Sequence, residues 1–69
     1  MNSSYDKIST KVVQIIKKSH EPLETVEIQG QLKSVSRTKL MYRLFHLRGD
    51  GLIHGKQIGS GKGAWVWWT

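Results

Sequence analysis

The chain has 69 residues, no cysteine and a formal net charge of +6 at pH 7. A chain of this length buries only about 60% of the surface that its unfolded form exposes, which excludes two compact domains and a large enclosed substrate cavity. Without cysteine, disulfides, thiolate zinc sites and iron–sulfur clusters are excluded too, so apolar packing must hold the fold. We therefore expect residues 1–69 to form a single domain with no cofactor and no metal.

The composition is typical of a soluble domain, with 38% hydrophobic and 23% charged residues. No apolar run approaches the roughly 18 residues that a membrane-spanning helix needs. The first residues, Met-Asn-Ser-Ser-Tyr-Asp, lack the apolar core of a signal peptide. These features predict a cytoplasmic protein, associated with the nucleoid if its source is prokaryotic or viral.

The charges are distributed unevenly along the chain. In residues 1–30 four lysines cancel four acidic residues, whereas residues 31–69 carry seven Lys and Arg residues and a single acidic residue, Asp50. The whole net charge therefore belongs to the C-terminal half. Such a half is typical of a surface that binds a polyanion, most commonly nucleic acid, although a basic surface that serves only solubility has the same composition.

A first helix is predicted over about residues 4–19, because apolar residues recur there every three or four positions. Ser3 or Ser4 is the expected N-cap, and Pro22 prevents the helix from continuing. The apolar stripe consists of Tyr5, Ile8, Val12, Val13, Ile15 and Ile16.

A second helix is predicted over about residues 24–33, after a brief extended residue at Leu23. Thr25 is a possible cap for this helix. Gly30 within it costs about 1 kcal/mol relative to alanine, which is tolerated where another backbone approaches closely. Residues 33–36 then form a turn.

The third helix is the clearest element of the sequence. Ser36 is its expected cap, and Gly49-Asp50-Gly51 ends it. Its inner stripe, at positions i, i+4 and i+7, consists of Leu40, Leu44 and Leu47.

Residues 52–58 and 64–68 are predicted to form two strands, joined by a glycine-rich tip into a two-stranded β-hairpin. Side chains alternate along a strand, so Trp65 and Trp67 share one face while Trp68 lies on the other. A two-stranded hairpin over a small core can bury only one of these faces. We therefore expect at least one tryptophan to be substantially exposed and to mark an interface.

Residues 35–53, Val-Ser-Arg-Thr-Lys-Leu-Met-Tyr-Arg-Leu-Phe-His-Leu-Arg-Gly-Asp-Gly-Leu-Ile, resemble the winged helix–turn–helix superfamily. The resemblance rests on the capping serine, the spaced leucines, the Gly-Leu-Ile step into a strand and the glycine-rich tip. It extends over nearly the whole chain. The resemblance implies an α+β fold of three helices with a C-terminal two-stranded hairpin, the wing.

The resemblance also implies a sequence-specific double-stranded DNA-binding protein, most simply a small transcriptional regulator. The third helix, about residues 36–48, would lie in the major groove, which accepts a helix, and the wing, about residues 58–63, on the backbone or in the minor groove. The candidate DNA-binding residues are Ser34, Ser36, Arg37, Thr38, Lys39, Tyr42, Arg43, Lys56 and Lys62. A lone domain of this kind reads a short half-site, so we also expect a homodimer.

Two other readings of the same resemblance stay open. Winged-helix domains also act as protein-interaction modules in larger replication or transcription assemblies, although their third helix is usually neutral or mixed in charge. A subfamily that binds left-handed nucleic acid carries an aromatic residue on the third helix and a tryptophan on the wing strand. Phe45 and Trp65 or Trp67 match those positions, whereas Met41 stands where that subfamily has asparagine, and its paired prolines are missing.

Catalysis and metal binding are not indicated by the sequence. His20, His46 and His54 have no paired ligand spacing. The few acidic residues do not combine with a nucleophile and a base into a catalytic set. We therefore do not expect an enzyme.

Overall fold

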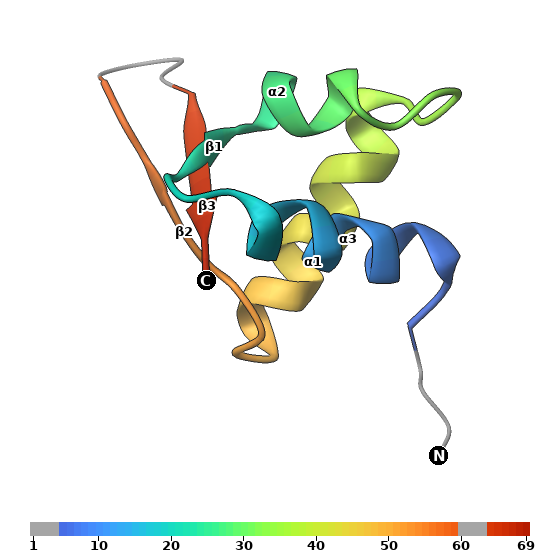
Figure 1. Ribbon diagram of the computed structural model, residues 1–69, viewed down its shortest axis with the longest axis horizontal. Coiled ribbons are helices and arrows are strands. Elements are labelled where there is room, and N and C mark those ends of the chain that lie inside the picture. Colours follow the sequence, from blue (N-terminus) through green and yellow to red (C-terminus); the bar gives the residue numbers. More distant parts are fainter. Residues whose placement is uncertain (1–4, 60–63) are drawn as a thin grey trace.

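Residues 5–59 and 64–69, which the computed structural model describes, form an α+β domain with three helices and a three-stranded antiparallel sheet. The helices lie on one side of the sheet, and α3 crosses behind α1 (Figure 1). The elements in chain order are α1 (Lys7–Lys18), β1 (Leu23–Glu24), α2 (Thr25–Gly30), α3 (Arg37–Gly49), β2 (His54–Gln57) and β3 (Trp65–Trp68). The expectation of three helices followed by two strands is confirmed.

The brief extended segment expected at Leu23 is a strand, β1, and it joins the expected hairpin in a three-stranded sheet. β3 is its central strand and pairs antiparallel with β2 on one side and with β1 on the other, where Leu23 lies opposite Trp67. β1 has only two residues, and so short a strand shows no alternation of polar and apolar residues that a sequence pattern could reveal. Pro22, which has no N–H to donate, directly precedes this edge strand.

The first two helices begin and end at other residues than expected. Asp6 is the N-cap of α1, and its Oδ1 accepts a hydrogen bond of 2.9 Å from the Ser9 N–H. The expected caps, Ser3 or Ser4, lie outside the described residues. α2 ends at Gly30 instead of residue 33.

The expected cap of α2, Thr25, is instead its first helical residue and is buried. Glu24 is the N-cap, and Glu27 closes a capping box, with its Oε1 accepting a hydrogen bond of 2.7 Å from the Glu24 N–H. A glutamate pair thus satisfies the helix start, which leaves the threonine hydroxyl for the core.

The core lies where the helices meet the sheet. The leucine stripe of α3 is fully buried, as the spacing predicted, and each such side chain contributes about 1.5–3 kcal/mol of transfer free energy. The buried apolar residues are Val12, Ile16, Ile28, Leu32, Leu40, Leu44, Leu47, Ile53 and Trp67.

Trp67 is the largest side chain in this core. Its Nε1–H donates a hydrogen bond of 2.9 Å to Thr25 Oγ1, so the buried indole N–H has an acceptor. Across the sheet Trp67 pairs with Gly55, and a Cβ at Gly55 would overlap the Trp67 ring. Only glycine therefore fits at this position of β2.

The expectation of a substantially exposed tryptophan is wrong, because neighbours on both faces of β3 cover the indoles. Trp67 is buried, and Trp65 and Trp68 are only partly exposed. Trp65 stacks on Trp67 at a centroid distance of 5.3 Å and meets the edge of Phe45 at 5.1 Å. Trp68 stacks on His54 at 5.7 Å. The prediction of a dimer therefore no longer has an exposed tryptophan to support it and rests only on the short half-site that a single domain reads.

Candidate nucleic-acid interface

The face of α3 opposite its leucine stripe is exposed. Thr38 and Tyr42 lie there, and the Tyr42 side chain is 65% accessible. Ser36 begins the helix as expected, with its Oγ accepting a hydrogen bond of 3.2 Å from the Lys39 N–H. Arg37 and Lys39 are both exposed in the first turn. The first half of α3 therefore presents two cations, a hydroxyl and a phenol to solvent.

The electrostatic potential at this end of α3 is expected to be positive. No acidic residue lies between Glu27 and Asp50 in the sequence. Asp50 lies at the far end of the helix, where its Oδ2 accepts a hydrogen bond of 2.5 Å from the Tyr5 hydroxyl. The unpaired N–H groups at the start of a helix add a partial positive charge. An anion is therefore attracted to the N-terminal half of α3 rather than to its end.

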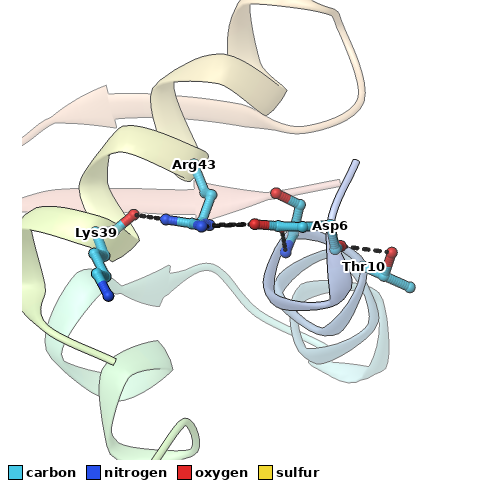
Figure 2. Close-up of polar contacts among 5 residues, drawn as sticks. Asp6, Thr10, Lys39 and Arg43 are labelled. Carbon is cyan, nitrogen blue, oxygen red and sulfur yellow. Dashed lines mark hydrogen bonds and ion pairs between the residues drawn. The ribbon is translucent and has the colours of Figure 1, made fainter. Parts of the chain in front are cut away.

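Arg43 does not lie free on the outer face of α3, where we expected a base-contacting residue. Its guanidinium forms an ion pair with Asp6 at the start of α1, with 2.6 Å between Nη2 and Oδ2 and 3.1 Å between Nε and Oδ2 (Figure 2). Nη1 donates to the Lys39 carbonyl oxygen at 3.2 Å, and the Arg43 side chain is only 21% exposed. Arg43 thus links α1 to α3.

The ion pair changes the proton affinity of both partners. The Arg43 guanidinium, together with the Ser9 N–H, holds the pKa of the Asp6 carboxyl well below its usual range. The same contact raises the pKa of Arg43. Asp6 is therefore charged at neutral pH, where it can pair with Arg43.

Arg48, the last arginine of α3, is also engaged within the fold. Its Nε donates a hydrogen bond of 3.0 Å to the Gly55 carbonyl oxygen. Its guanidinium carbon lies 5.4 Å from the centroid of the Trp65 ring, a distance at which a cation is attracted to an aromatic face. Arg48 therefore joins α3 to the hairpin of β2 and β3.

Lys56 does not lie with the exposed residues of α3. Residues paired across antiparallel strands point to the same face of a sheet, and Lys56 pairs with Val66, on the face opposite Trp65 and Trp67. The β2 residue on the face of Trp65 is Gln57, its register partner. The sequence alone did not predict this register, because the pairing of residues across strands is not a property of neighbouring residues. Lys62 lies outside the described residues.

The turn before α3 holds Ser34 in an unusual backbone conformation. Its φ of 66° lies in the left-handed region, which a residue other than glycine seldom adopts. The Gln29 side chain fastens the turn by donating a hydrogen bond of 3.3 Å to the Val35 carbonyl oxygen. Ser34 and Lys33 are exposed directly before the start of α3, as a backbone-contacting role requires.

Comparisons of the chain with protein-family models, with curated proteins and with solved structures find no match. Over residues 5–59 and 64–69, no helix has both the length and the apolar character that crossing a membrane requires. The same residues contain no cluster of three or more histidine, aspartate or glutamate side chains that could hold a metal ion.

Proposed function

We propose that the chain is a winged helix–turn–helix domain that binds double-stranded DNA sequence-specifically, most simply as a small transcriptional regulator. The observation that carries this proposal is the exposed first half of α3, which is basic and free of acidic side chains. α3 would enter the major groove, whose width accepts a helix. The tip of the hairpin between β2 and β3, about residues 58–63, would be the wing on the backbone or in the minor groove.

The side chains around α3 divide into two roles. Arg37, Thr38 and Tyr42 are exposed on the helix and are the proposed contacts to base edges or adjacent phosphates. Ser34, Ser36 and Lys39 surround the start of the helix and would contact phosphates, as would Lys62 on the wing. Arg43 holds α3 against α1, and Lys56 points from the other face of the sheet, so we leave both out of the direct contacts.

Selection of binding sites from random duplex DNA at two salt concentrations tests the proposal. We expect an enriched motif, and a log–log slope of affinity against salt of about −3 if Arg37, Lys39 and Lys62 meet phosphates. Tyr42→Ala should weaken the selected site more than random DNA, whereas Lys17→Gln, on an exposed position of α1, should preserve the preference. Absence of binding at about 50 mM salt, or binding without any preferred motif, would contradict a sequence-specific regulator.

A two-fold dimer remains part of the proposal, because a single α3 reads only a short half-site. Its action on DNA would place it in the cytoplasm, at the nucleoid in a prokaryotic or viral setting. The exposed large apolar side chains away from the proposed DNA-contacting face, which could join two copies, are Val26 and Leu52. Sedimentation at about 100 µM, alone and with a selected site, tests the dimer.

One observation favours a second candidate, binding of left-handed duplex. Phe45 on α3 is 43% exposed, and its ring meets Trp65 on β3 edge-on at 88°. Phe45 and Trp65 correspond to the aromatic residue on the third helix and the tryptophan on the wing strand in the subfamily that binds left-handed nucleic acid. Met41, however, takes the position of that subfamily's asparagine, and its sulfur lies 3.6 Å from Thr25 Oγ1, within the fold.

Circular dichroism of an alternating d(CG) duplex distinguishes the two candidates. Inversion of the duplex spectrum on adding protein at moderate salt would favour the left-handed form, and Phe45→Ala should abolish it. An unchanged duplex spectrum together with an enriched motif in the selection favours the proposed regulator. If the protein binds no duplex of either hand, the protein-interaction module is the remaining reading of the fold.

A further inference from the structure

An open groove runs along the surface where α1 meets α2 and the turn that precedes α3. α1 and α2 lie side by side in Figure 1 and contact each other at the base of this groove. Two hollows of about 510 Å³ each adjoin along this contact and share Lys11, Gln31 and Leu32 in their walls. Together they form one open groove, which we call the α1–α2 groove.

The α1–α2 groove is lined by cations along one edge. Its α1 wall carries polar residues at i, i+4, i+7 and i+11, a spacing that places side chains in a row along a helix. Lys33 continues the positive charge at the end of the groove that leads into α3. The row consists of Lys7, Lys11, Gln14 and Lys18.

Among the residues that the structure describes, no acidic side chain lines the α1–α2 groove. Asp6 is held by Arg43, Glu27 caps α2, and Glu21 lines a different hollow beside Trp68. Asp6 also lines a neighbouring hollow together with Lys7 and Lys11, so it lies beside the lysine row although it does not line the groove. The helical spacing of the lysines in the sequence could have predicted that they form a row on one side of α1. Only the fold shows where the acidic residues lie relative to this row.

The positions of Lys7 and Lys11 are unfavourable to α1, whereas Lys18 lies in the last turn, where the helix dipole favours a cation. Lys7 lies in the first turn, where the helix dipole disfavours a cation, and like charges at Lys7 and Lys11 stand at the repulsive i, i+4 spacing. No ion pair within the described residues offsets either lysine. A bound polyanion would attract both lysines and the positive start of the helix, and would thereby offset the unfavourable dipole interaction and the repulsion between the two lysines.

We propose that the α1–α2 groove is a second phosphate-binding surface, which follows the sugar–phosphate backbone of the duplex DNA beside the segment that α3 reads. The inference rests on the proposed function for the identity of the polyanion. The row from Lys7 to Lys18 is ~16 Å long at the rise of an α-helix, which equals the rise of about five base steps along the axis of a duplex. Lysines are flexible point charges, which suit a repeating backbone better than a single bidentate anion.

The position of the groove explains how one duplex reaches both surfaces. Lys33 and Ser34 line its end, and the chain passes from there through Ser36 directly into α3. A backbone that contacts the start of α3 can therefore continue over the turn and along α1. The groove would add sequence-independent affinity to the base contacts that α3 makes.

The test compares two lysines on the same helix. Lys11→Gln removes a groove cation, and Lys17→Gln removes one from the other side of α1, beside Tyr5 and Leu52. Both are exposed, and both changes remove one charge and keep a good helix former. We expect Lys11→Gln to make the salt slope for a random duplex shallower by about 0.9, and Lys11→Gln/Lys18→Gln by about 2. Lys17→Gln should leave the slope unchanged.

Backbone amide shifts in an NMR titration with the same duplex separate the possible outcomes. Shifts along both α1 and α3, with the slope changes above, support the groove. Shifts in α3 alone, with equal slopes for Lys11→Gln and Lys17→Gln, overturn the groove and leave the proposed function standing. Shifts in α1 without α3 support the groove and contradict the proposed role of α3. Absence of duplex binding overturns both proposals.

Discussion

Arg43 and Asp6 are 37 positions apart in the sequence, and their side chains join the middle of α3 to the first turn of α1. Asp6 also caps α1 through the Ser9 N–H, so one carboxylate orients a helix start and an arginine together. The orientation of α3 relative to α1 thus depends on a contact at the edge of the proposed interface.

The stability of the fold should depend on the ionisation of Asp6. Since its pKa is lowered in the folded state, Asp6 contributes stability above its unfolded pKa of about 3.9, and this contribution is lost as the pH falls through the folded pKa. Asp6→Asn keeps a capping side chain but removes the charge. In urea titrations the difference in unfolding free energy between wild type and Asp6→Asn should therefore shrink as the pH falls below about 4. A constant difference would contradict the role of the ion pair.

Gly55→Ala should destabilise the protein by about 1–3 kcal/mol, because the new methyl group overlaps the buried ring of Trp67. Gly49→Ala is the matched control, since a Cβ at Gly49 meets no atom within 4 Å and Gly49 lies at the end of α3. We expect the control to be neutral or slightly stabilising. Chemical denaturation followed by tryptophan fluorescence measures both. Equal stability of the two variants would show that the ring does not occupy this space.

Thr25→Val should cost about 1–3 kcal/mol, because it leaves the buried Nε1–H of Trp67 without an acceptor. Thr25→Ser keeps the hydroxyl and loses only a methyl group, so it should cost less than Thr25→Val. Thermal unfolding of the three proteins gives the order. If Thr25→Val is the more stable variant, the hydrogen bond contributes nothing and packing alone governs this position.

Arg37→Ala and Arg43→Ala should have different effects. Arg37 is exposed, so its loss should leave stability unchanged while weakening the selected DNA site by about 1–3 kcal/mol and relaxing one base position. Arg43→Ala should instead slightly lower the unfolding free energy and weaken all duplexes similarly. Fluorescence anisotropy with selected and random duplexes, alongside denaturation, checks both. If Arg43→Ala weakens binding to the selected site more than binding to random DNA, and stability is unchanged, Arg43 contacts bases rather than holding α3 against α1.

The three helices and the buried face of α3 could be predicted from the sequence, because local periodicity and capping chemistry are properties of neighbouring residues. The leucine stripe and the Ser36 cap of α3 are the clearest cases. The last strand followed from its tryptophans and valine, which favour strands, and the hairpin followed from the glycines before it.

Contacts between distant residues were decided only by the tertiary structure. The β1 strand exists because β3 offers it hydrogen bonds, and the tryptophans are covered because α3 and β2 lie against them. Arg43 belongs to the outer face by helical spacing alone, yet Asp6 draws it toward α1. Lys7, Lys11 and Lys18 line a groove in which the described residues include no acid, because the packing of α1 against α2 decides which side chains meet there. Charges and ring faces act through space, and their partners depend on how the elements pack rather than on their order in the chain.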